Sequence, residues 1–335
     1  MAKRRNVLMG VGGMIAVAGC SDTSEPEIES DNESEEEEEI QEEESEEEEE
    51  LELEEEPEEE QEDTESEEEE EENEDRQDAI SKIDSAKDIL EEGLQIYADF
   101  GENGEGILDI TSMNEDFRFT NVVNHIRDAD EDLEEAEEYS IEDLTEEIDT
   151  LRKEYNIIDH IARTQRQGQV TRRDADSYDS SMNGSRTNLI SLRGHNESLE
   201  EGNDDFEENI SDLATMVDNT PEFIIRDKSL YERKVIQFDD EHSVFDSYID
   251  MHSDYERGVE TLNDAESAYS SEEYNTAEFR ARDAERSFED CLDRLSEPET
   301  DELEDLTDSL KRTINSDIRT ARRLQEDAAD AEDRS

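Results

Sequence analysis

The chain has 335 residues, of which 109 are acidic and 31 are Lys or Arg, and its formal net charge is −78. Because nucleic acid is itself a polyanion, this charge excludes nucleic acid as an expected partner. A domain with so much like charge repels itself at ordinary ionic strength. The Debye length falls to about 3 Å in 1 M salt, so the composition predicts folding in concentrated salt.

The first twenty residues have the pattern of an export signal. Lys3, Arg4 and Arg5 form a basic start, a weakly apolar stretch follows, and the sequence Val-Ala-Gly-Cys ends at Cys20. The apolar stretch is too short to span a bilayer as a mature helix, which favours a cleaved signal. An uncleaved anchor with a chance cysteine is the alternative interpretation.

Two parts of this signal resemble known export motifs. Arg4 and Arg5, before a glycine-containing apolar stretch, resemble a twin-arginine signal, and the residues that end at Cys20 resemble the lipobox of prokaryotic lipoproteins. The acidic, Trp-free composition is similar to that of halophilic archaeal proteins. The resemblance implies that residues 1–19 are removed and that Arg4 and Arg5 direct export. It also implies that a lipid on Cys20 anchors the chain to the outer face of the cell membrane.

A strongly acidic segment follows the signal. Residues 21–75 hold 37 Asp or Glu and no Lys or Arg. Such a segment cannot bury enough apolar surface to offset its ordering entropy, so residues 20–77 are predicted to be a disordered tether. Repulsion along this tether favours an extended spacer, and low-affinity binding of divalent cations is the alternative role. The folded domain is expected over residues 78–335.

From residue 78 onward the apolar residues recur at helical spacing, and no segment has the alternating pattern of a strand. The first amphipathic stretch ends at the glycine-rich residues 101–106, and Pro221 and Pro298 mark later boundaries. The following apolar faces lie at 119–136, 141–162, 182–217, 231–269, 274–295 and 303–328. The sequence therefore predicts an all-α fold, an elongated antiparallel helical bundle.

One apolar face indicates coiled-coil-like packing. Residues 182–217 keep a 3.5-residue repeat for five heptads, with Asn196 and Asn203 inside it. Residues 163–181 contain few large apolar side chains, and the repeats on either side are out of phase. We therefore predict a turn within 163–181 that joins 141–162 and 182–217 as a long antiparallel hairpin, with Leu151 beside Leu192.

Residues 265–288 resemble one tetratricopeptide-type helical hairpin. Its small and aromatic positions are matched by Ala265, Tyr269, Tyr274, Ala277, Ala284 and Phe288. The characteristic Trp, Leu-Gly and closing Pro are missing, and the pattern does not recur at a period of about 34 residues. The resemblance implies a tight helical hairpin over 259–295 and nothing about a ligand.

The residues that usually carry chemistry form no catalytic or metal motif. None of the five His, at 125, 160, 195, 242 and 252, has a His or Cys three or four residues further on. Cys291 lies on an apolar face and is predicted to be a core residue. We therefore expect no enzyme activity, no metal and no cofactor. Among four Asn-x-Ser sequons, Asn183 is the predicted glycosylation site, because it lies in a polar region before Gly184.

These patterns predict a lipid-anchored, cell-surface helical protein with a structural or protein-interaction role and a protein partner that the sequence does not identify. The alternative is an extracytoplasmic binding component that delivers a ligand to a membrane partner. Such components usually have an α/β fold, which the missing strand pattern disfavours. An enzyme ranks third, since no catalytic motif is present.

Overall fold

The computed structural model describes residues 59–101, 106–182, 188–295 and 301–334. These residues form α-helices and two short 3₁₀-helices, with no strand among them. The helices are α1 (Glu59–Ala98), η1 (Ile107–Asp109), α2 (Phe119–Glu138), η2 (Glu142–Leu144), α3 (Thr145–Met182), α4 (Leu189–Asn219), α5 (Lys228–Ser270), α6 (Tyr274–Arg294) and α7 (Asp301–Glu332). The prediction of an all-α fold is confirmed.

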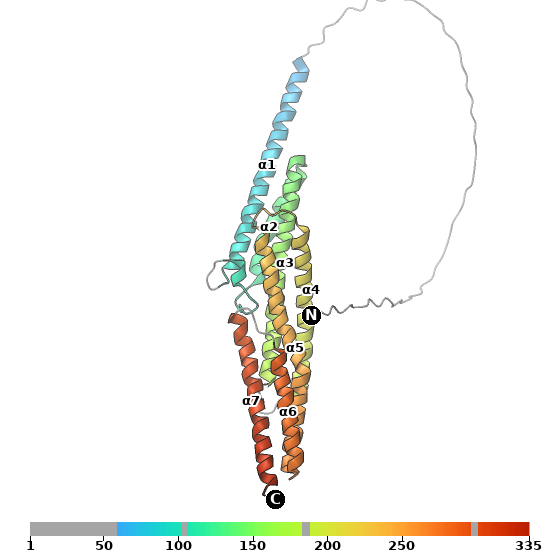
Figure 1. Ribbon diagram of the computed structural model, residues 1–335. Coiled ribbons are helices and arrows are strands. Elements are labelled where there is room, and N and C mark those ends of the chain that lie inside the picture. The colour runs from blue at the N-terminus through green and yellow to red at the C-terminus, as the bar shows by residue number, and fades with distance from the viewer. Residues whose placement is uncertain (1–58, 102–105, 183–187, 296–300, 335) are drawn as a thin grey trace, which may run out of the picture. The chain divides into compact units, whose positions relative to one another are not determined.

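Each α-helix packs against the next one along the chain, and the long helices α3, α4 and α5 also pack together (Figure 1). The other helices attach to different halves of this trio. Tyr97 of α1 donates a hydrogen bond to Gln165 in the middle of α3, at 2.8 Å. Ser309 of α7 donates to Asp179 near the end of α3, at 2.7 Å. The result is the predicted elongated antiparallel bundle.

One apolar core runs through the described helices from α1 to α7, with a small separate cluster of Ala268, Ala277 and Ala328 where α5, α6 and α7 meet. The predicted apolar face of α4 is confirmed almost residue by residue. Its buried members include Leu192, Asn196, Leu199, Asn203, Phe206, Ile210, Leu213 and Val217. The two predicted core asparagines are thus buried with the apolar residues of the repeat.

The predicted turn within 163–181 is wrong, because α3 continues through this segment to Met182. The chain reverses between Met182 and Leu189, so the antiparallel hairpin of α3 and α4 exists with a later turn. Side chains of α3 are buried there although they are polar, and Thr164 and Gln165 are fully buried. Thr164 donates to the carbonyl of His160, and Gln165 accepts from Tyr97, each at 2.8 Å. This part of α3 is therefore buried through hydrogen-bonded polar side chains, and it lacks the apolar pattern by which a buried helix is recognised in a sequence.

The hairpin of α5 and α6 is tight, as the sequence predicts. The residues where the two helices approach are small, and an added Cβ on Gly258 would lie only 2.5 Å from the ring of Phe288. The turn contains Glu272 in a left-handed conformation, with a φ of 63°. The amide of Glu273 donates back to the carbonyl of Ala268 at 2.9 Å, which closes the end of α5.

Helix α1 begins at Glu59, inside the segment assigned to the tether. Glu and Gln are good helix formers, so this composition supports a helix even without a core. Among the described side chains of α1, residues 72–78 are exposed and Ala79 is the first that is buried. Since α1 has 40 residues and α2 has 20, the first part of α1 extends beyond its partner (Figure 1).

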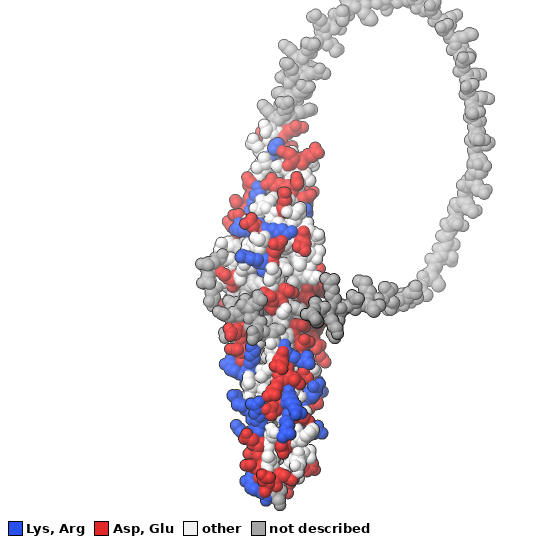
Figure 2. Space-filling view, in the orientation of Figure 1, with Lys and Arg blue, Asp and Glu red and all other residues white. Residues whose placement is uncertain are grey.

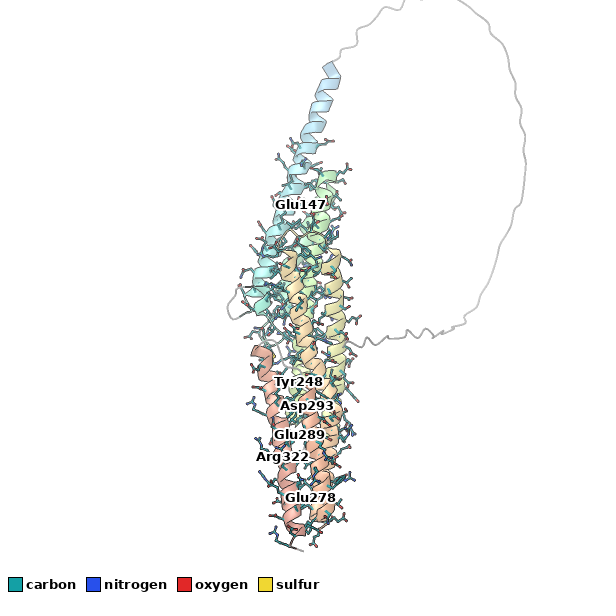
Figure 3. The ribbon with its side chains drawn as sticks, in the orientation of Figure 1. Glu147, Tyr248, Glu278, Glu289, Asp293 and Arg322 are labelled. Atoms are coloured by element: carbon teal, nitrogen blue, oxygen red, sulfur yellow. The ribbon has the colours of Figure 1, made fainter. Side chains whose placement is uncertain are left out.

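Acidic side chains cover much of the surface, with Lys and Arg interspersed among them (Figure 2). Some of the basic residues link neighbouring helices. Arg322 of α7 lies beside Glu289 of α6 at 2.9 Å (Figure 3), and Lys87 of α1 lies 2.7 Å from Glu147 of α3. Such exposed pairs contribute only about 0–1 kcal/mol each and less in concentrated salt.

Candidate functional site

A cavity of about 620 Å³ lies between the loop that precedes α2, the first turn of α2 and the middle of α3. Four arginines line it, namely Arg118, Arg166, Arg172 and Arg173, together with only two acidic residues, Glu115 and Asp176. The lining therefore carries a positive excess in a chain whose net charge is −78. Such a local reversal of charge favours the approach of anions.

The loop before α2 is fixed by short-range hydrogen bonds and by aromatic packing. The backbone N–H of Thr111 donates to the side chain of Asn114 at 2.6 Å, and the N–H of Phe117 donates to the carbonyl of Asn114 at 3.2 Å. The buried ring of Phe117 packs edge-on against Tyr97, with ring centroids 4.9 Å apart. This anchor holds the following residue, Arg118, at the entrance to α2.

Arg118 occupies the N-cap position of α2, and no side chain caps this helix end. The first backbone N–H groups of a helix have no partner within the helix, and the helix dipole makes this end positive. Phe119 and Thr120, the first two residues of α2, line the cavity. The start of α2 therefore adds backbone donors to a wall that already carries arginine.

Three arginines of α3 line the cavity, and within the described parts of the chain only Arg172 among them has an ion-pair partner. Arg172 lies 2.7 Å from Glu115, and its Nε lies 3.0 Å from Asp176, although without hydrogen-bond alignment to that carboxylate. The hydrogen bond from Arg172 lowers the pKa of Glu115. Among the described residues, Arg166 and Arg173 have no carboxylate at ion-pair distance. Both are exposed, and Arg166 lies over the ring of Phe119, 4.4 Å from its centroid.

The floor of the cavity is polar and well connected. Ser112 is only 1% exposed, and its backbone N–H donates to the carboxylate of the buried Glu241 at 2.9 Å. The Oγ of Ser112 is buried and has no hydrogen-bond partner among the described residues. A buried hydroxyl without a partner costs free energy, so this atom marks a place where a further polar group would fit.

Behind this floor lies a buried polar layer around Lys234, which is 0% exposed. Its ammonium donates to Gln165 and Gln237, at 3.2 Å each, and to the carbonyl of Ile110. It also lies over the ring of Phe238, 4.4 Å from the centroid. A buried charge persists only when it is compensated in this way. The layer fixes the position of the loop at residue 110 and thus of the cavity floor.

The site residues predicted from the sequence do not lie in this cavity. Arg4, Arg5, Cys20 and Asn183 are outside the described residues. Cys291 is buried in the core, and burial raises the pKa of its thiol to about 12, which makes it unreactive.

The histidines are dispersed over the bundle. His160 contacts the carbonyl of Asn209, and His252 contacts the hydroxyl of Tyr178, at 3.0 Å each. Burial lowers the pKa of His252. In the part of the chain that the structure describes, no three His, Cys, Asp or Glu residues are grouped to hold a metal ion. Nor does any helix of that part combine the length and the apolar character that crossing a bilayer requires.

The arginines of the cavity were not among the predicted site residues, because they belong to no motif of His, Cys or paired acids. A signal was nevertheless present. Residues 163–173 contain four arginines, Arg163, Arg166, Arg172 and Arg173, and no acidic residue, in a chain where acids outnumber bases more than threefold. The contribution of Arg118 could not be found in this way, since only the fold brings it to α3.

Comparison with protein-family models, curated proteins and solved structures found no match to this chain.

Proposed function

We propose that this protein is a lipid-anchored, cell-surface helical protein with a structural or protein-interaction role. The observation that carries the proposal is the arrangement of α1. This helix begins at Glu59, and among its described side chains residues 72–78 are exposed and Ala79 is the first that is buried. The exposed stretch of residues 72–78 spans about 10 Å at 1.5 Å per residue. This part of α1 leads from the bundle toward the N-terminal segment of the chain. The expected lipid on Cys20 would hold the protein through that segment.

The anchor is tested by fractionating cells that express full-length variants. Cys20→Ser is expected to release the protein into the medium or to leave it unprocessed. Cys291→Ala is the matched control, because it removes the other cysteine of the chain and is expected to leave membrane partition unchanged. Partition of the Cys20→Ser protein with membranes as a mature form of unchanged mass would refute the lipid anchor.

The export route is tested separately. Replacing Arg4 and Arg5 together by Lys is expected to block export, because twin-arginine signals require the arginine pair. Undiminished export would instead assign the chain to the general secretory route. This result would leave the anchor on Cys20 untouched, so the two proposals fail independently.

The interaction role is tested by isolating the anchored protein from membranes in concentrated salt and identifying what is bound to it. A defined protein recovered with the wild type, and lost when residues 59–78 are deleted, would support a role that depends on this first part of α1. Nucleic acid is not an expected partner, since the chain carries a net charge of −78.

A second candidate function is the extracytoplasmic binding component that delivers a ligand to a membrane partner. The cavity between α2 and α3 is the observation that favours it. Small-molecule sites also occur between the helices of bundles, so this role does not require an α/β fold.

A further inference from the structure

We propose that the cavity between α2 and α3 binds a small oxyanion that carries at least two negative charges. Arg166 and Arg173 are its main contacts. The inference concerns the cavity alone and holds whether or not the chain is anchored through Cys20.

The charge of the cavity lining favours an anionic ligand. Acidic residues outnumber basic ones by 109 to 31, so an arginine without a nearby carboxylate is unusual in this chain. Arg166 and Arg173 both line the cavity, and neither has a carboxylate at ion-pair distance among the described residues. The acids of the lining, Glu115 and Asp176, are both held by Arg172. The two remaining guanidinium groups of α3 are therefore available to a ligand.

The spacing of Arg166 and Arg173 favours a ligand with two oxyanion groups. Arg166 and Arg173 are seven residues apart on one helix, so they lie about two turns, or roughly 10 Å, apart along the axis of α3. Each guanidinium can bind a carboxylate or phosphoryl group through two parallel hydrogen bonds. A ligand that contacts both therefore needs two oxyanion groups. The cavity volume of about 620 Å³ is in the range of small-molecule sites.

Further hydrogen-bond donors lie in the cavity wall beside the arginines. The uncapped start of α2 presents backbone N–H groups and the positive end of a 20-residue helix. The buried Oγ of Ser112 has no partner in the part of the chain that the structure describes, and its hydroxyl can donate to an oxygen of the ligand. Together with the arginines of α3, these donors come from three separate segments, and each is suited to an anion.

The experiment measures binding of two probes, inorganic pyrophosphate and citrate, to the full-length protein by isothermal titration calorimetry. Chloride is kept constant at the concentration that keeps the protein folded. Pyrophosphate tests phosphoryl recognition, and citrate tests carboxylate recognition. We expect saturable binding of at least one probe. Absence of binding for both would overturn the proposal.

The decisive variant is the double substitution R166Q/R173Q. Because both arginines are exposed, the fold is expected to persist. Affinity is expected to fall about tenfold or more, since two charge-assisted contacts are lost. The matched control is R312Q/R319Q, which removes two exposed arginines at the same seven-residue spacing on α7. Equal affinity of the two double variants would overturn the proposal.

A third variant, S112A, separates binding from stability. The Oγ of Ser112 has no partner to lose in the free protein, so the melting temperature should not fall, while the affinity should. An affinity equal to that of the wild type would remove Ser112 from the site and refute the part of the proposal that rests on this hydroxyl.

Discussion

The hydroxyl of Thr171 on α3 donates a hydrogen bond, 2.8 Å long, to the carbonyl oxygen of Gly202 on α4. An added Cβ on Gly202 would lie 3.5 Å from this hydroxyl, which is an ordinary van der Waals distance. The same carbonyl accepts from Gln167 at 3.1 Å, one turn earlier on α3. These bonds fix the register of the hairpin, and they place Leu151 far from Leu192.

The register can be measured with spin labels at Arg152 and Arg193. Counted from the contact between Thr171 and Gly202, the two positions are offset by about 28 residues along the hairpin, or roughly 40 Å. A turn within 163–181 would bring the labels to packed-helix distance, about 10 Å between axes, and a single continuous helix would separate them by about 60 Å. The control pair Arg163 and Glu208, both exposed and opposite each other in the observed register, should give less than about 25 Å.

The error in the predicted turn shows what apolar periodicity can and cannot indicate. The face of α4 is predicted correctly because large apolar residues mark it at almost every turn. The middle of α3 is buried through Thr164, Gln165 and Thr171, which have hydrogen-bond partners in the folded chain. Since those partners lie on other helices as well as on α3, the sequence of this segment alone resembles an exposed turn.

The cavity illustrates the same limit. The cluster of arginines at 163–173 is visible in the sequence, as is the absence of acids within it. Whether an arginine has a carboxylate partner outside its own helix is decided by the fold. Arg172 is paired with Glu115, which is 57 residues away along the chain. The four-residue spacing indicates the pair of Arg172 and Asp176 on α3, whereas no local pattern indicates the partner Glu115.

Two glycine substitutions, one where α5 approaches α6 and one at an exposed position of α4, are expected to change stability in opposite directions. In Gly258→Ala the added methyl group would lie 2.5 Å from the ring of Phe288, which cannot move freely in the core. We expect a loss of about 1–3 kcal/mol in the free energy of unfolding. Gly194→Ala, in an exposed position of α4 with no atom within 4 Å, should gain about 0.5–1 kcal/mol. Urea unfolding in concentrated salt measures both, and a stabilised Gly258→Ala protein would contradict the observed packing.

The acidic surface predicts that the fold depends on salt. When the salt is diluted to tens of millimolar, the Debye length grows to about 10–30 Å, so acidic groups on neighbouring helices repel one another. Circular dichroism at 222 nm should therefore show loss of helix on dilution from multimolar salt. KCl and NaCl at equal ionic strength should act alike if screening is the cause. A helical signal that is unchanged at low salt would contradict the prediction.

The partly buried carboxyl of Asp317 predicts a pH dependence with a definite sign. Its side chain accepts a hydrogen bond from Tyr255 at 2.8 Å, and burial raises its pKa above the ordinary value of 3.8. The folded chain therefore binds a proton at a pH where the unfolded chain has released it. Unfolding then releases that proton, and the contribution of Asp317 to stability falls as the pH rises from about 4 through the folded pKa.

Asp317→Asn removes this charge and keeps an oxygen that can accept from Tyr255. We expect the variant to be more stable than the wild type at pH 7, because no charge has to be buried, and the gain to shrink as the pH falls toward 4. Asp308→Asn is the matched control, since it removes one acid from an exposed position on the same helix. Urea unfolding of the three proteins at several pH values in concentrated salt provides the comparison. If Asp317→Asn and Asp308→Asn change the free energy of unfolding equally at every pH, burial of Asp317 is not the cause of the pH dependence.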